Sequence, residues 1–280
     1  MRQLEESVAV VTGAATGIGR ALAARLAAEG ARLCLADINE AGLDEVARGL
    51  KDGGAEVLSR VVDVADARQV EALAHAVSGH YGRADLLFNN AGVTLLGDFE
   101  EVSLPDIEWL MSINFWGVVY GVRHFLPILK QRKKAYIVNM SSVFGIVAPP
   151  GQAAYCASKF AVRGFTEALR HELEGTCVQV STVHPGGIKT GIATSGRVGA
   201  NVSPERREQD CAKFGRLAAT TPERAAERII RGVLRGETRI LVGRDASQVE
   251  LIQRLLPVRY WRLIGPIIER RTKRKNDDSS

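Results

Sequence analysis

Cysteine is scarce and scattered in this 280-residue chain. Its four cysteines, Cys34, Cys156, Cys177 and Cys211, form no CxxC pair and no cluster with histidine. Structural zinc sites and disulfide frameworks both need such groupings, so neither is predicted and no metal ion is expected. Chains without a disulfide framework are typical of reducing compartments, and we therefore expect a cytoplasmic protein.

Signals for export and for crossing a membrane are also missing. The N-terminal stretch MRQLEESVAVVTG carries two glutamates and leads directly into an apolar run, without the basic start and apolar core of a secretory signal. The longest run without a charged residue, 135–158, is a poor membrane span because polar residues and prolines interrupt it. We expect this run to be a buried strand followed by a loop.

The formal net charge of +5 comes from one end of the chain. Residues 251–280 hold eight Lys/Arg and three Asp/Glu, so the preceding 250 residues are formally neutral. A nucleic-acid-binding domain would instead carry a basic face with interleaved aromatic residues. The charge distribution therefore argues against a nucleic acid as partner.

What is present is an alternation of short apolar runs with longer segments of helical period. This order is typical of repeated βαβ units, and the 46% hydrophobic content is enough for a large core. The pattern predicts a single α/β domain over 1–250, with a doubly wound parallel sheet of the Rossmann type between two helical layers (three-layer α/β/α), and a basic C-terminal extension at 251–280. The predicted strands are 8–11, 32–36, 56–62, 86–89, 136–140, 178–184 and 239–242; the predicted helices are 18–29, 40–51, 67–81, 104–131 and 154–174.

The alternation weakens after residue 184. Residues 190–215 are rich in glycine and in charged residues, so we expect a mobile excursion over the ligand site. Another helix is predicted after Thr221, because threonine is a favourable N-cap residue. Pro222 and Glu223 suit the first turn of a helix.

A glycine-rich loop follows the first predicted strand, with the sequence Thr12-Gly13-Ala14-Ala15-Thr16-Gly17-Ile18-Gly19. Glycines between a strand and a helix let backbone N–H groups approach a pyrophosphate, and the helix dipole favours its negative charge. The GxxxGxG spacing differs from the GxGxxG of the best-known dinucleotide fingerprint, and a tight turn without a ligand would use the same residues. The position in the first βα unit favours nucleotide binding.

Asp37 ends the second predicted strand, about twenty residues past the loop, where an acid accepts hydrogen bonds from the adenosine ribose. A 2′-phosphate would call for a basic residue here, but Ile38 follows Asp37, and Ala15 and Thr16 occupy the loop. NAD is therefore predicted in preference to NADP. A solvated acid at a strand end is the alternative.

Tyr155 and Lys159 are four residues apart in a predicted helix, and this spacing places both side chains on one face. A phenol is a poor acid or base at neutral pH, because its ordinary pKa is about 10. A nearby ammonium favours the phenolate and lowers that pKa. Ser142, at the end of a buried strand, could donate a hydrogen bond to a substrate oxygen. A Tyr/Lys pair at this spacing is common on helices and is weak evidence by itself. Its occurrence after the glycine loop, Asp37 and Ser142, in this order, favours a catalytic role.

This combination resembles the short-chain dehydrogenase/reductase family over residues 8–190. The matching residues are the glycine loop, Asp63-Val64, Asn89-Asn90-Ala91-Gly92, Asn114, Ser142, Tyr155-Cys156-Ala157-Ser158-Lys159 and Pro185-Gly186-Gly187-Ile188-Lys189-Thr190.

The resemblance implies a Rossmann-type enzyme and a role for each matching position. Tyr155 would be the general acid/base, Lys159 would lower its pKa and bind the nicotinamide ribose, Ser142 would orient the substrate oxygen, and Asn114 would hold a water that links Lys159 to solvent. The implied cofactor contacts are the glycine-loop residues Gly13, Thr16, Gly17, Ile18 and Gly19, Asp37 at the ribose, Asp63 and Val64 at the adenine, Asn90 on the adenosine side, and Ile188 and Thr190 at the nicotinamide carboxamide. Ala91, Gly92, Tyr155, Lys159, Pro185 and Gly186 are further implied cofactor contacts.

The substrate region is apolar in sequence. Residues expected around it include Leu95, Leu96, Phe99, Val143, Phe144, Ile146, Val147 and Pro149. They indicate an apolar secondary alcohol or ketone, such as a steroid-, retinoid- or fatty-alcohol-like molecule, although the same residues would also suit a core.

The C-terminal extension mixes Leu, Ile, Tyr260 and Trp261 with arginines. Residues 251–275 could contact an anionic membrane surface, or the tail could pack on the substrate pocket or on a neighbouring subunit. Pro257, Gly265 and Pro266 are expected to interrupt any long helix there.

Three function classes remain open from the sequence. The first is an NAD-dependent oxidoreductase of apolar alcohols or ketones, with an NADP-linked carbonyl reductase as its variant. The second is a non-catalytic nucleotide-binding scaffold, and the third is a membrane-surface enzyme. The family resemblance also implies a homodimer or homotetramer formed through the helices that bear Asn114 and Tyr155.

Overall fold

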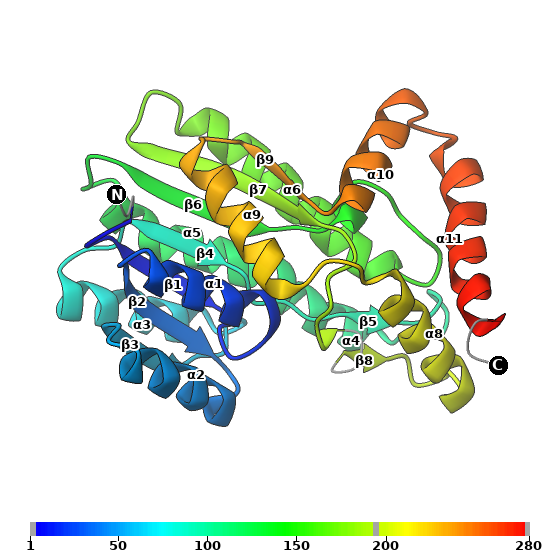
Figure 1. The fold of residues 1–280 in the computed structure, drawn as a ribbon, viewed down its shortest axis with the longest axis horizontal. Helices are drawn as coiled ribbons and strands as arrows, with labels where there is room; N and C mark the ends of the chain where they lie inside the picture. The colour runs from blue at the N-terminus through cyan, green and yellow to red at the C-terminus, as the bar shows by residue number, and fades with distance from the viewer. Residues whose placement is uncertain (1–3, 193–195, 278–280) are drawn as a thin grey trace.

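A computed structural model of the chain describes residues 4–192 and 196–277. Seven parallel strands of these residues form the central sheet (Figure 1). They are β1 (Val8–Thr12), β2 (Arg32–Asp37), β3 (Val57–Val61), β4 (Leu86–Asn89), β6 (Ala135–Met140), β7 (Val178–Pro185) and β9 (Arg239–Val242). Their order, β3-β2-β1-β4-β6-β7-β9, confirms the predicted doubly wound sheet.

The strand order changes direction beside β1, which pairs with β2 on one side and with β4 on the other. Ligands of doubly wound sheets bind at the carboxyl ends of the strands on either side of such a switch point. Every residue of β1 is buried, as expected for a central strand that is covered on both faces.

Helices cover both faces of the sheet (Figure 1). Alternate residues of β1 point to opposite faces: Ala9 and Val11 belong to one apolar layer, and Val8 and Val10 to the other. The first layer contains buried residues of α1 (Gly17–Ala28), α2 (Glu40–Asp52) and α9 (Pro222–Leu234). The second contains residues of α3 (Ala67–Tyr81), α5 (Gly117–Leu129) and α6 (Ala153–Glu172). The three-layer arrangement is therefore the predicted one.

A chain of buried polar side chains ties the sheet to α6. Asn89 Nδ2 donates to Asn139 Oδ1 at 2.8 Å, and Asn139 Nδ2 donates to Thr166 Oγ1 at 3.0 Å. These residues lie on β4, β6 and α6, and each is no more than 3% exposed. Since buried polar groups need partners, the bonds fix α6 relative to the strand ends beside it.

The predicted excursion at 190–215 holds more regular structure than expected. Strand β8 (Arg197–Val198) pairs with β5 (Leu95–Leu96), and helix α8 (Pro204–Leu217) begins at Ser203, whose hydroxyl accepts from the Arg206 N–H. No residue of α8 is buried. The polar composition that indicated a loop is thus that of a surface helix.

The C-terminal residues form α10 (Arg244–Leu255) and α11 (Tyr260–Asp277), at the right-hand end of Figure 1. Pro257 separates the two helices as expected, but α11 continues through Pro266, which the sequence predicted as a break. Proline inside a helix costs about 3 kcal/mol. Packing offsets that cost, because Ile264 is only 4% exposed and clusters with Ile146 and Val147.

The structure therefore shows that this part of α11 packs on the same chain. Among the residues that the structure describes, no helix combines the length and the apolar character needed to cross a bilayer.

Candidate active site

The glycine loop lies between β1 and α1 at the switch point, and its glycines are required by close contacts. Gly13 and Gly17 have φ angles of +66° and +53°, which residues with a Cβ rarely adopt. A Cβ on Gly13 would lie 2.8 Å from the Ala91 Cα, and one on Gly17 would lie 3.1 Å from Thr190 Cγ2. The structure thus brings together loop residues and Thr190, which are far apart in sequence.

The N-terminus of α1 has no side-chain cap. Thr16 occupies the N-cap position without a capping hydrogen bond, whereas Asn39, Asp66 and Ser103 cap α2, α3 and α4 (Leu104–Met111). An uncapped first turn presents backbone N–H groups and the positive end of the helix dipole, so the loop fits the diphosphate of a dinucleotide.

Asn90 supports this loop from the end of β4. Its Nδ2 donates to Thr12 O at 2.9 Å and to Gly13 O at 3.1 Å, and its backbone N–H donates to Thr12 Oγ1 at 3.0 Å. The sequence placed Asn90 on the adenosine side of the cofactor. In the structure its amide holds the loop carbonyls, so it positions the loop.

Asp37 lies beside the same loop. Its carboxylate accepts from the Ala15 N–H and from the Asn39 N–H, both at 2.9 Å. The loop's nearest arginine in sequence, Arg20, has its guanidinium 2.8 Å from the Glu45 carboxylate. This end of the site is therefore anionic.

Asp63 and Val64 follow β3 at the same edge of the sheet. Asp63 Oδ1 accepts from the Ala65 N–H at 2.9 Å, and Val64 is 8% exposed. A Cβ on Gly117 would lie 2.9 Å from Val64 Cγ2, which places the end of β3 against the start of α5.

Ser142, Tyr155 and Lys159 converge where β6 ends and α6 begins. Each is less than a tenth exposed. The Ser142 side chain acts on the Tyr155 phenol and lowers its pKa. Lys159 Nζ lies 5.7 Å from the centre of the Tyr155 ring and donates to Met140 O at 3.1 Å. Tyr155 and Lys159 therefore share one face of α6, as predicted. Ser142, which follows β6, belongs to the same cluster.

Burial dominates the proton equilibria of this cluster. It raises the pKa of Tyr155 to about 12, against the opposing effect of the Ser142 side chain. It also lowers the pKa of Lys159 to about 8. The sequence predicted that Lys159 would lower the pKa of Tyr155; in the structure the largest influence on this pKa is desolvation, which raises it.

Asn114 lies next to Lys159, in a π-helical turn, Ser112–Trp116, between α4 and α5. Its Oδ1 accepts from the Val93 N–H at 2.8 Å, and its Nδ2 donates to Val93 O at 3.0 Å and to Ser158 Oγ at 3.1 Å. A Cβ on Gly92 would lie 3.2 Å from Asn114 Oδ1 and 3.3 Å from Lys159 Nζ. The predicted neighbours are thus adjacent, and the water held by Asn114 stays a prediction.

The segment from Pro185 to Thr190 is held by residues that the sequence did not single out. Asp245 Oδ2 accepts from the Gly187 N–H at 2.7 Å, and Ile188 forms a parallel bridge with Thr220. Asp245 lies 58 residues from Gly187. No local pattern could have indicated this contact, because the pairing of β7 with β9 creates it.

His184 was interpreted only as the residue before the Pro-Gly turn. Its ring is fully buried, and its Nδ1 lies 2.9 Å from Ser142 O, an acceptor, so this nitrogen carries the proton. Burial lowers the pKa of His184 to about 4. A neutral histidine therefore anchors the backbone of Ser142.

Aromatic side chains pack one after another next to Tyr155. Phe144 makes edge-to-face contacts with Tyr155 and with Phe214 of α8, each with ring centres 6.1 Å apart. Of the other predicted lining residues, Ile146 and Val147 pack on α11, and Phe99 is 70% exposed. Phe214 was missed because it lies in the segment interpreted as a mobile excursion.

Four buried side-chain polar atoms in the described part of the chain have no hydrogen-bond partner: Thr94 Oγ1, Gln152 Oε1, Arg32 Nε and His184 Nε2. The first two lie on either side of one backbone segment. The two residues flank Leu95, whose carbonyl accepts from Gln152 Nε2 at 3.4 Å. Buried unpaired acceptors are rare and call for an explanation.

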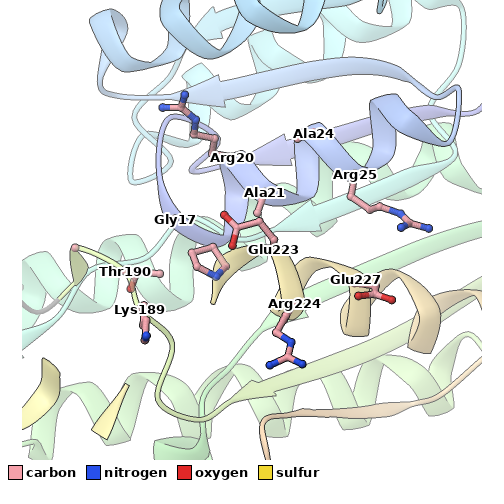
Figure 2. Close-up of a pocket in the computed structure, with 12 residues that line it drawn as sticks. Gly17, Arg20, Ala21, Ala24, Arg25, Lys189, Thr190, Glu223, Arg224 and Glu227 are labelled. Atoms are coloured by element: carbon pink, nitrogen blue, oxygen red, sulfur yellow. The ribbon is translucent and has the colours of Figure 1, made fainter. Parts of the chain in front are cut away.

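A cavity of about 640 Å³ is lined by residues of α1, residues 189–191 and the start of α9. Figure 2 shows side chains that line it. Gly17 and Thr190 belong to its wall, and so do the charged residues Arg20, Arg25, Lys189, Glu223, Arg224 and Glu227. The cavity therefore reaches the edge of the glycine-loop site.

A doubly wound sheet with a glycine loop at its switch point and a Ser–Tyr–Lys cluster beside it defines a Rossmann-type α/β protein with an oxidoreductase site. The model of the family described as "short chain dehydrogenase" matches residues 7–199. The chain belongs to the short-chain dehydrogenase/reductase family, whose enzymes act on CH–OH groups.

Named relatives share most of the chain. SadH of Mycobacterium tuberculosis, provisionally named an oxidoreductase, is 44% identical over 269 residues, which cover 95% of this chain and 96% of SadH. A "CLA biosynthesis dehydrogenase/reductase" of Lactiplantibacillus plantarum is 36% identical over 195 residues, 69% of this chain and 68% of that protein. The crystal structure of a short-chain dehydrogenase/reductase from Burkholderia phymatum in complex with NAD superposes with a TM-score of 0.85 at 34% identity, over 91% of this chain and 95% of that one.

Proposed function

We propose that the protein is an NAD-dependent oxidoreductase of apolar secondary alcohols or ketones. The observation that carries the proposal is the burial of Tyr155 together with Ser142, which lowers the pKa of its phenol, and with Lys159, whose Nζ lies 5.7 Å from its ring centre. The nicotinamide, when bound, supplies the hydride acceptor or donor. All other steps are assigned to side chains of this chain.

Ser142 orients the substrate oxygen by donating a hydrogen bond, and Tyr155 exchanges a proton with that oxygen. Because burial keeps its pKa well above neutral, Tyr155 retains its proton and is ready to donate it to a carbonyl oxygen. The ammonium of Lys159 lowers the cost of the phenolate that remains. Alcohol oxidation is the reverse step and starts from the phenolate form of Tyr155, whose Oη accepts the hydroxyl proton as the hydride leaves the carbon for the nicotinamide.

A substrate panel tests this activity directly. Secondary alcohols and ketones of graded polarity are offered with NAD(H) and with NADP(H), and the absorbance of the reduced nicotinamide is followed. We expect turnover with NAD and the highest kcat/KM for apolar substrates, because Phe144 packs against Tyr155 and Phe214 packs against Phe144. Absence of turnover with the whole panel would contradict the proposal.

The unpaired Gln152 Oε1 and Thr94 Oγ1 support one refinement of the substrate class. A hydroxyl on the substrate, remote from the reacting carbon, would satisfy one of these atoms. Within the apolar part of the panel, compounds with a second hydroxyl are therefore expected to have the lower KM.

The preference for NAD over NADP rests on Asp37. We expect Asp37→Ala combined with Ile38→Arg to lower the NAD/NADP ratio of kcat/KM by roughly 10- to 100-fold, because a hydrogen bond to a charged group contributes about 1.5–3 kcal/mol. Steady-state kinetics with both cofactors measures the ratio. Asp44→Ala, which removes an exposed acid of α2, serves as control. A wild-type enzyme that prefers NADP would favour the alternative, an NADP-linked carbonyl reductase.

The proposal includes a homodimer or homotetramer. Trp116 and Phe160, on the helices that bear Asn114 and Tyr155, are 47% and 40% exposed, and such exposed aromatic side chains are typical of subunit contacts. Light scattering of the eluted protein would give the molar mass, and a monomer would remove this part of the proposal.

A further inference from the structure

The turn between α10 and α11 and the outer face of α11 expose large apolar side chains among arginines. The exposed fractions are 71% for Leu255, 90% for Val258, 49% for Leu263 and 46% for Ile267. We call this surface the C-terminal patch and define it by these four residues together with Arg254, Arg259 and Arg262.

We propose that the C-terminal patch binds the surface of membranes that contain anionic phospholipids. The proposal does not depend on the oxidoreductase activity. It describes a peripheral contact, in which apolar side chains enter the interface and arginines meet the phosphates.

The patch is an ordered surface because its opposite face is anchored. Tyr260 Oη accepts from the Ala148 N–H at 3.1 Å, and Trp261 and Ile268 pack in the cluster that buries Ile264. With the inner positions 260, 261, 264 and 268 directed at the protein, the helical period directs 259, 262, 263, 266 and 267 outward. Cationic and apolar side chains therefore share the outer face of α11 and the residue before it.

The charge of the patch has one sign. No Asp or Glu occurs between residues 251 and 268, and the sequence after Glu269 adds Arg270, Arg271, Lys273, Arg274 and Lys275. Arg254 pairs with Glu250 at 3.4 Å, whereas none of the ion pairs within the described part of the chain involves Arg259 or Arg262. A cationic group near an anionic membrane is attracted by about 1 kcal/mol.

A second copy of the chain is a poorer occupant. In a twofold contact the same surface meets itself, so a patch whose charges are all positive would bring like charges together. An anionic bilayer matches both the charge and the apolar side chains. The turn that carries Val258 lies at the upper right of Figure 1, at the edge of the molecule, where a flat surface can reach it.

Binding of the full-length protein to vesicles tests the proposal. Vesicles of phosphatidylcholine alone are compared with vesicles that also contain phosphatidylglycerol, and the bound fraction is measured by sedimentation. We expect binding to the anionic vesicles alone, weakened by added salt. Equal binding to both compositions, or to neither, would overturn the proposal.

Two matched pairs of variants locate the contact. Val258→Ser with Leu263→Ser, and Arg259→Glu with Arg262→Glu, should each reduce the affinity for anionic vesicles at least about tenfold. The control Leu104→Ser alters an apolar residue that is 70% exposed on α4, and Arg48→Glu with Arg235→Glu matches the change in net charge outside the patch. Both controls should bind like the wild type. Equal losses in the control and patch variants would contradict the assignment.

Light scattering of the same variants separates a lipid surface from a second copy. Because the changed side chains are exposed, melting temperatures should stay those of the wild type, which excludes unfolding as a cause. If the patch variants lose a dimer that the wild type forms without lipid, the patch is a subunit contact and the proposal is wrong.

Discussion

Tyr155→Phe is expected to lower kcat by about 10²- to 10⁴-fold while the Kd for NAD stays nearly unchanged. The substitution removes only the hydroxyl, which general acid–base catalysis needs for proton transfer. The ring remains to pack against Phe144. Steady-state kinetics gives kcat, and titration calorimetry gives the Kd.

Tyr120→Phe is the matched control for this experiment. Tyr120 is half-buried and its ring stacks on Trp116, outside the Ser142–Tyr155–Lys159 cluster. Tyr120→Phe removes the same chemical group from a tyrosine outside the cluster, so kcat should stay within about twofold of the wild type. If Tyr155→Phe kept wild-type turnover, the acid/base assignment would be wrong and a nucleotide-binding scaffold would become the better hypothesis.

Asp85→Ala is expected to lower the free energy of unfolding by about 3 kcal/mol. Asp85 is 6% exposed, accepts from the Val8 N–H at 2.9 Å, and its carboxylate lies 2.6 Å from Arg83 and 3.0 Å from Arg132. Truncating one member of a buried ion pair leaves the other charges without a partner, which costs about 3–5 kcal/mol. Partial solvation of the two arginines favours the lower end of this range.

The stabilising effect of Asp85 should depend on pH. Although burial opposes ionisation, the hydrogen bonds from Arg83, Val8 and Arg132 hold the pKa of Asp85 below its usual range. A carboxyl with a lowered folded-state pKa stabilises the protein above its unfolded-state value of about 4 and loses this effect as the pH falls through the folded-state value. Urea denaturation of wild type and Asp85→Ala should therefore differ most near neutral pH and converge in acid.

Asp44→Ala again provides a control, because it removes an exposed acid of α2 and should change stability by less than about 0.5 kcal/mol. A constant difference between wild type and Asp85→Ala down to strongly acidic pH would show that the ionised carboxylate is not the source of the stability.

The fold was predictable where the local pattern and the global topology impose the same constraint. The apolar run at Val8–Thr12 must be a buried strand, because all five residues need cover, and the glycine loop that follows needs backbone conformations with positive φ. The prediction was wrong where the sequence pattern was ambiguous. Helix α8 has no buried residue, so its sequence lacks the apolar stripe that would have indicated a helix.

Helix α11 was misjudged for another reason. Proline is a local signal, and Pro266 indicated a break. The helix nevertheless continues, because Ile264 and its neighbours bury apolar surface against Ile146 and Val147, more than a hundred residues away in sequence. Packing at such separations cannot be read from a local pattern.

The sequence by itself determined the sheet, because apolar periodicity is a local property of the chain. The resemblance of its motifs to a known family indicated the family and a site with Ser142, Tyr155 and Lys159. Tertiary structure alone decided that Asn90 supports the glycine loop, that Asp245 holds the Gly187 backbone and that burial sets the pKa of Tyr155. Those three results arise from contacts between distant segments and from removal of solvent, and both exist only once the chain has folded.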